Sequence, residues 1–106
     1  NMKILTGELL AAFRRVREKY RSIAEMAKAM GVSASMMSRI LRGKTSHISD
    51  RHWITMRCIV EPAWCGKPCE DVVGCSLRRL LQTILDVDPD EYPEIEKYVK
   101  EKYGRN

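Results

Sequence analysis

Apolar residues recur along much of this chain at the three- and four-residue spacing of a helix that buries one face. The first such segment follows Thr6, a residue type that can cap a helix. Its apolar positions are Leu9, Leu10, Phe13, Val16 and Tyr20. The opposite face carries Arg14, Arg15, Arg17 and Lys19. The pattern predicts a helix that backs the core and keeps most of these basic side chains in solvent. The alternative is a phosphate contact by one of them near the end of the helix.

The stretch from Ser22 to Lys44 predicts two short helices joined by a tight turn. Ser22 and Ser33 can cap the two helices. Gly31 can end the first helix, because a residue without a Cβ adopts positive φ at little cost. The second helix should end at Gly43. The inward positions are Ile23, Ala24, Met26, Ala27 and Met30, with Val32 at the corner, and then Met37, Ile40 and Leu41. The outward positions of the second helix are Ala34, Ser35, Met36, Ser38, Arg39 and Arg42.

The remaining segments predict a fourth, a fifth and a sixth helix. The fourth begins at Ser49 or Asp50 and ends before Pro62, and a linker from Glu61 to Cys69 follows it. The fifth begins between Cys69 and Ser76, with apolar positions Val73, Leu77, Leu80, Leu81 and Ile84. After a turn-rich acidic connector, the sixth runs from Pro93 to Tyr103, with Ile95, Tyr98 and Val99 on one side.

Together these segments predict an all-α fold of five to six helices, which we expect to form one domain. A chain of 106 residues is long enough to bury a helical core. Residues 2–61 would form a helix-turn-helix core. Residues 62–106 would add a cysteine-containing linker and C-terminal helices, which complete the core, form a dimer interface, or do both.

The central residues resemble the phage-repressor and Cro-type helix-turn-helix proteins, also called XRE-like. The resemblance lies in Ala27, Gly31-Val32-Ser33, Met37-Ser38-Arg39-Ile40 and Arg42-Gly43-Lys44, each at the relative spacing of the family. It covers about residues 6–60. One departure is Ile23, which stands where the family commonly has a glutamine that donates to a phosphate. The resemblance implies a Cro-type fold that binds double-stranded DNA, commonly as a dimer.

In such a motif the second helix enters the major groove with its N-terminal residues. The candidate base contacts are Ser33, Ala34, Ser35 and Arg39. Arg39 is the strongest candidate, because its planar guanidinium matches the N7 and O6 acceptors of guanine. Ser38 is short enough to reach a base or a phosphate. By resemblance, the other candidate phosphate contacts are Arg42, Lys44, Thr45 and Ser46.

The charge of the chain is unevenly distributed around its net value of +5. Residues 1–57 hold 12 Lys and Arg against 4 Asp and Glu, a net charge of +8. Residues 58–106 hold 7 against 10, a net charge of −3. A polyanion would therefore be attracted to the half that contains the motif. A solvated basic surface is the alternative interpretation of the charge taken alone.

Four cysteines, Cys58, Cys65, Cys69 and Cys75, are candidates for a different chemistry. Four ligands suit a structural zinc ion, but neither pair has the usual Cys-x2-Cys spacing. Cys65 and Cys69 are separated by one residue more than the cysteines of a thioredoxin motif, and the sequence predicts none of the strands of that fold. We interpret the four as reduced thiols, with a zinc site and a redox switch as alternatives, and we expect no cofactor.

These observations predict a regulator of transcription, not an enzyme, that binds double-stranded DNA site-specifically. One short helix reads only a few base pairs, so we expect a homodimer on a pseudo-palindromic operator, acting as a repressor. No apolar run approaches the roughly 20 residues that span a bilayer, which favours a cytoplasmic protein without a membrane partner. The alternatives are a thiol-based redox or zinc-responsive protein using Cys65 and Cys69, and an antitoxin-like module that binds other proteins.

Overall fold

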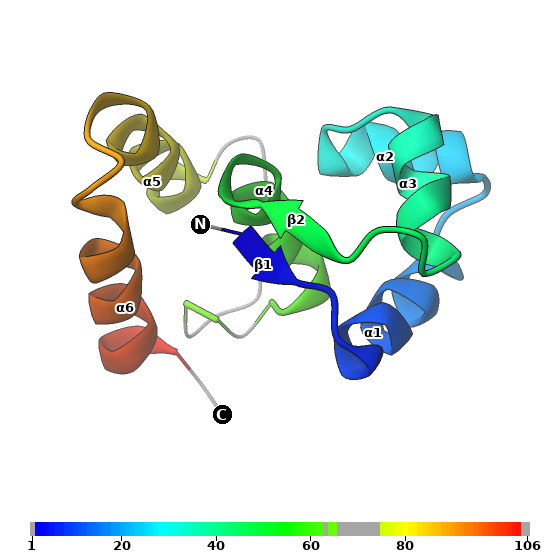
Figure 1. Cartoon of the computed structure of the whole chain (residues 1–106), viewed down its shortest axis with the longest axis horizontal. Coiled ribbons are helices and arrows are strands. Elements are labelled where there is room, and N and C mark those ends of the chain that lie inside the picture. The colour runs from blue at the N-terminus through cyan, green and yellow to red at the C-terminus, as the bar shows by residue number, and fades with distance from the viewer. Residues whose placement is uncertain (1, 63, 66–74, 105–106) are drawn as a thin grey trace. The chain divides into compact units, whose positions relative to one another are not determined.

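The computed structural model describes residues 2–62, 64–65 and 75–104, which form six helices and two short strands (Figure 1). The chain divides into two compact units, residues 1–56 and residues 57–106. The elements are β1 (Met2–Ile4), α1 (Gly7–Arg17), α2 (Ile23–Met30), α3 (Ala34–Leu41), β2 (His47–Ser49), α4 (Asp50–Val60), α5 (Ser76–Val87) and α6 (Tyr92–Tyr103). The division between the units falls within α4. The prediction of a mostly helical chain is confirmed.

The helices of the first unit begin at the residues that the sequence predicts as caps. The Thr6 hydroxyl accepts a hydrogen bond from the Leu9 amide at 3.2 Å. The Ser22 hydroxyl accepts from the Glu25 amide and the Ser33 hydroxyl accepts from the Met36 amide, each at 3.1 Å. Each cap satisfies one of the amides that the first turn of a helix leaves without a backbone partner.

The core of the first unit is built from the predicted inward faces together with the start of α4. Its buried apolar residues are Leu9, Phe13, Val16, Met26, Ala27, Met30, Met37, Ile40, Ile48, Trp53, Ile54 and Met56. Ala24 was wrongly predicted to face inward, since it is exposed. At 100° per residue, Ala24 lies about 110° around α2 from the centre of the buried stripe that Met26, Ala27 and Met30 form.

An antiparallel pair of strands is a feature that the all-α prediction missed. β1 and β2 pair with Met2 opposite Ser49 and Ile4 opposite His47. The ladder continues with the Leu5 amide donating to the Ser46 carbonyl at 2.9 Å. Strands of three residues are too short to show a two-residue alternation, and their pairing is not local in the sequence. The sequence pattern therefore held no signal for them.

The second unit contains the end of α4, Trp64, α5 and α6. Cys75 caps the start of α5, because its sulfur accepts a hydrogen bond from the Arg78 amide at 3.5 Å. α5 packs against α6. The buried residues of these two helices are Leu81, Tyr92 and Val99. Within the described residues, the predicted start of α5 near Ser76 is confirmed, and residues 66–74 lie outside them.

Two apolar residues of the predicted stripes on α5 and α6 are exposed. Leu80 is 56% exposed and Tyr98 is 55% exposed. Each directly precedes a buried residue, Leu81 or Val99, and lies 100° around its helix from it. The described parts of the chain contain no helix that is long and apolar enough to cross a membrane.

Candidate nucleic-acid interface

The turn between α2 and α3 is set by one glycine and two short hydrogen bonds. Gly31 has φ 71° and ψ 28°, which is the left-handed conformation predicted from the sequence. The Gly31 amide donates to the Lys28 carbonyl at 3.2 Å, and the Val32 amide donates to the Ala27 carbonyl at 3.0 Å. This is the usual arrangement of a helix C-terminus closed by a glycine. The chain reverses there and α3 starts at the next cap, Ser33.

α3 is anchored on its inner side and exposed on its outer side. Met37 and Ile40 are fully buried, and α3 packs against both α2 and α1 (Figure 1). The opposite side holds three of the four predicted base contacts and one predicted phosphate contact, and one further residue of each kind lies at an end of the helix. The exposed members on α3 or at its ends are Ser33, Ala34, Ser35, Arg39 and Arg42, and Ser38 and Met36 are half-buried. The helix therefore presents a row of short side chains that ends in two arginines.

Arg39 has the position and the freedom that a base contact requires. It is exposed, and its side chain makes no hydrogen bond or ion pair with any residue that the structure describes. α3 contains no acidic residue that would neutralise it. Its guanidinium therefore keeps all five donors for a ligand. Ser33 is more restricted, because its oxygen already accepts from the Met36 amide, which leaves the hydroxyl proton and one lone pair for a ligand.

The predicted phosphate contacts lie in the last turn of α3 and the loop after it. Arg42 and Lys44 are exposed, and Thr45 is half-buried. The Lys44 amide donates to the Arg39 carbonyl at 2.9 Å, which fixes the path of the loop directly after the helix. The Ser46 hydroxyl already pairs with His47 Nδ1 at 2.9 Å. All nine predicted contacts thus lie within residues 33–46, and seven of them are exposed.

The two units carry charges of opposite sign. Residues 1–56 hold 11 Lys and Arg against 4 Asp and Glu, a net charge of +7. Residues 57–106 hold 8 against 10, a net charge of −2. The exposed row of α3 belongs to the basic unit. Only this unit has the net positive charge that an attraction to phosphates requires.

Tyr20 lies in the turn that leads into α2. Its carbonyl accepts a hydrogen bond from Arg17 Nη1 at 2.9 Å. Partial burial, and then the nearby Glu25 carboxylate, raise the pKa of the Tyr20 phenol above its usual value. The phenol is therefore neutral at physiological pH and leaves the positive charge of this unit unchanged.

Arg14 is a residue of this region that the sequence pattern assigned to a mostly solvated face. Its Nε donates to the Leu41 carbonyl at 3.0 Å and so joins α1 to the end of α3 across 27 positions of sequence. Helical periodicity shows that Arg14 points away from the core, but it carries no information about which neighbouring helix lies within reach.

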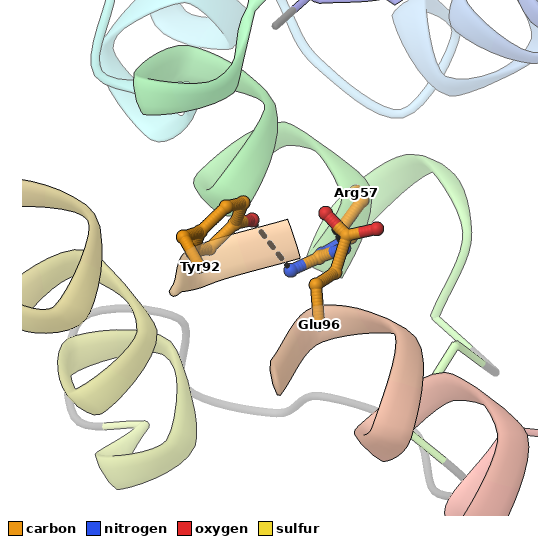
Figure 2. A network of polar contacts seen from close by, with 3 residues as sticks. All are labelled: Arg57, Tyr92 and Glu96. Atoms are coloured by element: carbon orange, nitrogen blue, oxygen red, sulfur yellow. Dashed lines mark hydrogen bonds and ion pairs between the residues drawn. The ribbon is translucent and has the colours of Figure 1, made fainter. Parts of the chain in front are cut away.

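Arg57 is a buried charge in the second unit that the periodicity of apolar positions did not predict. Only 3% of it is exposed. Its Nη1 lies 3.4 Å from a Glu96 carboxylate oxygen, and its Nη2 donates to the Tyr92 hydroxyl at 3.3 Å (Figure 2). Its guanidinium carbon lies 3.7 Å from the centre of the Trp64 ring. Arg57 lies among the buried residues of α4, and this position could have indicated a paired charge, since a buried charge requires a partner.

These contacts attach the end of α4 to α6 and give Arg57 a structural role. A guanidinium stacks favourably on an aromatic ring, and the Glu96 carboxylate compensates part of its charge. Arg57 Nε and Trp64 Nε1 are buried without a hydrogen-bond partner among the residues that the structure describes. The cluster joins the end of α4 and Trp64 to α6, and it includes none of the predicted DNA contacts.

The four cysteines are only partly described. Cys58 is buried, and Cys65 and Cys75 are half-buried. Cys69, one of the two residues of the predicted redox pair, lies outside the described residues. Among the residues that the structure does describe, no group of three or more histidine, cysteine or acidic side chains could hold a metal ion. The zinc and redox alternatives stay predictions.

Comparisons with protein-family models, with curated proteins and with solved structures find no match to this chain. The functional interpretation of residues 33–46 therefore depends on their chemistry and geometry alone.

Proposed function

We propose that the first unit is a Cro-type helix-turn-helix that binds double-stranded DNA, with the exposed side of α3 in the major groove. The observation that supports this most is the exposed row on α3, which stands opposite the buried Met37 and Ile40 in a unit of net charge +7. A helix fits the width of the major groove, and a helix anchored from behind can present its outer side chains at a fixed angle. No acidic residue on α3 opposes the approach of phosphates.

The predicted contact residues divide into those that bind bases and those that bind phosphates. Arg39 donates to the N7 and O6 atoms of a guanine, while Ser33, Ala34 and Ser35 make the shorter contacts nearer the start of α3. Ser38, Arg42, Lys44, Thr45 and Ser46 bind the backbone and fix the register of α3 without reading sequence. His47 pairs with Ser46 and so orients its hydroxyl.

The protein acts as a homodimer on a pseudo-palindromic operator and represses transcription by occupying it in the cytoplasm, without catalysing a reaction. Two copies of α3 placed one helical turn apart read enough base pairs for useful specificity. Leu80 and Val87 of α5 are 56% and 79% exposed, which supports the second unit as the surface of self-association. The two residues are seven positions apart, so they lie on the same side of α5.

Selection of bound fragments from a pool of random duplexes tests this proposal. We expect an enriched motif with two-fold symmetry and half-sites about 10 base pairs apart, centre to centre. The affinity for any duplex should fall as the salt concentration rises. No binding to any duplex at about 50 mM salt would contradict the proposal and favour a helical module that binds other proteins.

A further inference from the structure

The C-terminal end of α3 is closed by hydrogen bonds to all four of its last carbonyls. The Ser38 carbonyl accepts from the Arg42 amide, the Arg39 carbonyl from the Lys44 amide, and the Ile40 carbonyl from the Gly43 amide, at 2.9 to 3.0 Å. The last carbonyl, that of Leu41, accepts from Arg14 Nε at 3.0 Å. A helix end normally leaves such carbonyls to water or to the following turn. Here a side chain from α1 completes the end of the exposed helix.

Arg14 and Arg42 are held in the same manner at this end. Arg42 Nε donates to the Ser38 carbonyl at 3.4 Å, as Arg14 Nε donates to the Leu41 carbonyl. The two carbonyls are three residues apart on one helix, so they are separated by about 4.5 Å along its axis. Both arginines are exposed, and their Nη atoms make no hydrogen bond or ion pair with any residue that the structure describes. Two guanidinium groups therefore stand within one helical turn of each other with their outer donors unused.

This arrangement changes the electrostatics of the helix end. The C-terminus of a helix carries partial negative charge, which would repel a phosphate placed near it. A guanidinium bound to each of two carbonyls there replaces this repulsion with positive charge. A guanidinium held by its Nε has also lost part of its rotamer freedom before any ligand arrives. Its Nη atoms form the outer side of a planar fork, which suits the oxygen atoms of a phosphate.

We propose that Arg14 is a phosphate-binding residue that acts with Arg42 as a pair at the C-terminal end of α3. The inference rests on the proposed DNA-binding function and adds to it a contact from α1. Arg14 has two roles in this arrangement. Its Nε closes α3, and its Nη atoms bind the backbone of the duplex that α3 reads.

The test measures the Kd of the full chain for duplexes of about 20 base pairs, two helical turns, over about 50 to 300 mM salt. Arg14→Gln removes the charge, and Arg14→Lys keeps the charge but removes the Nε donor. Arg15→Gln is the matched control, because Arg15 is exposed on the same helix and its side chain makes no hydrogen bond or ion pair with the described residues. Arg14 is exposed and makes one hydrogen bond, so its substitution leaves the core intact, and circular dichroism verifies the fold of each variant.

Arg14→Gln should weaken binding to every duplex by the same factor, roughly tenfold, and should lower the slope of log K against log salt by about one. Arg14→Lys should keep the wild-type slope and lose less affinity, and Arg15→Gln should bind as the wild type does. If Arg14→Gln lowers the affinity but keeps the wild-type slope, Arg14 only closes α3 and this inference is wrong. If the wild type itself binds no duplex at about 50 mM salt, the proposed function fails as well.

Discussion

Substitution of Gly31 by alanine should destabilise the first unit by a cost that comes from the backbone alone. Gly31 has φ +71°, and a Cβ built on it would have no heavy atom within 4 Å. An L-residue in the left-handed region costs about 1–2 kcal/mol. Alanine offsets about 0.4–1 kcal/mol of this cost, because it lowers the conformational entropy of the unfolded chain relative to glycine. The net loss should be about 1 kcal/mol, and Gly31→Asn should lose less because asparagine tolerates this conformation.

Urea unfolding followed by tryptophan fluorescence measures this loss. Trp53 is buried in the first unit and Trp64 in the second, so a Trp64→Phe background leaves Trp53 as the reporter of the first unit. With a slope of about 1 kcal/mol per M, Gly31→Ala should lower the midpoint by about 1 M. Gly7→Ala is the control, since a Cβ at Gly7 also meets nothing within 4 Å and its φ is not positive. Equal midpoints for Gly31→Ala and the parent, or an equal loss at Gly7, would refute the argument from backbone conformation.

Two further predictions concern the second unit. Glu96→Gln should destabilise it by about 2 kcal/mol, because it leaves the buried Arg57 charge without its carboxylate, whereas Arg57→Met should stay within about 1 kcal/mol of the wild type. Urea unfolding followed by Trp64 in a Trp53→Phe background checks the order, which a larger loss for Arg57→Met would contradict. Gly104→Ala should also destabilise this unit, because its Cβ would lie 2.4 Å from the Lys100 carbonyl oxygen and 2.9 Å from that of Trp64. A thermal melt by circular dichroism measures this loss, and an unchanged Tm would show that the C-terminal turn moves freely away from Trp64.

The features that the sequence predicted well depend on neighbours along the chain. Caps such as Ser22 and Ser33 act on an amide three residues away, and Gly31 acts on the turn in which it lies. The exposed row of α3 follows in the same way from helical periodicity, which places Arg39 opposite Met37 and Ile40. These signals are contained in short windows of sequence.

The features that the sequence missed depend on contacts between distant segments. β1 pairs with a strand that begins after α3, and Arg14 binds a carbonyl 27 residues away. Arg57 contacts Tyr92 across 35 residues. A periodic pattern indicates which side of a helix is buried, but it does not indicate which element covers that side. The predicted contact residues therefore lie on one exposed helix side and the loop after it, while the arginine that closes this helix from α1 was not identified.

The most direct test of the central claim compares Arg39→Ala with Lys44→Ala in binding to the selected operator and to an unrelated duplex. If α3 reads bases and the following loop binds phosphates, Arg39→Ala should lose roughly 1–3 kcal/mol on the operator, with little effect on the unrelated duplex. Lys44→Ala should weaken both complexes alike and lower the salt slope by about one. Equal losses of binding free energy from the two substitutions on both duplexes would contradict the assignment of Arg39 to bases and Lys44 to phosphates. The placement of α3 in the major groove would then be contradicted as well.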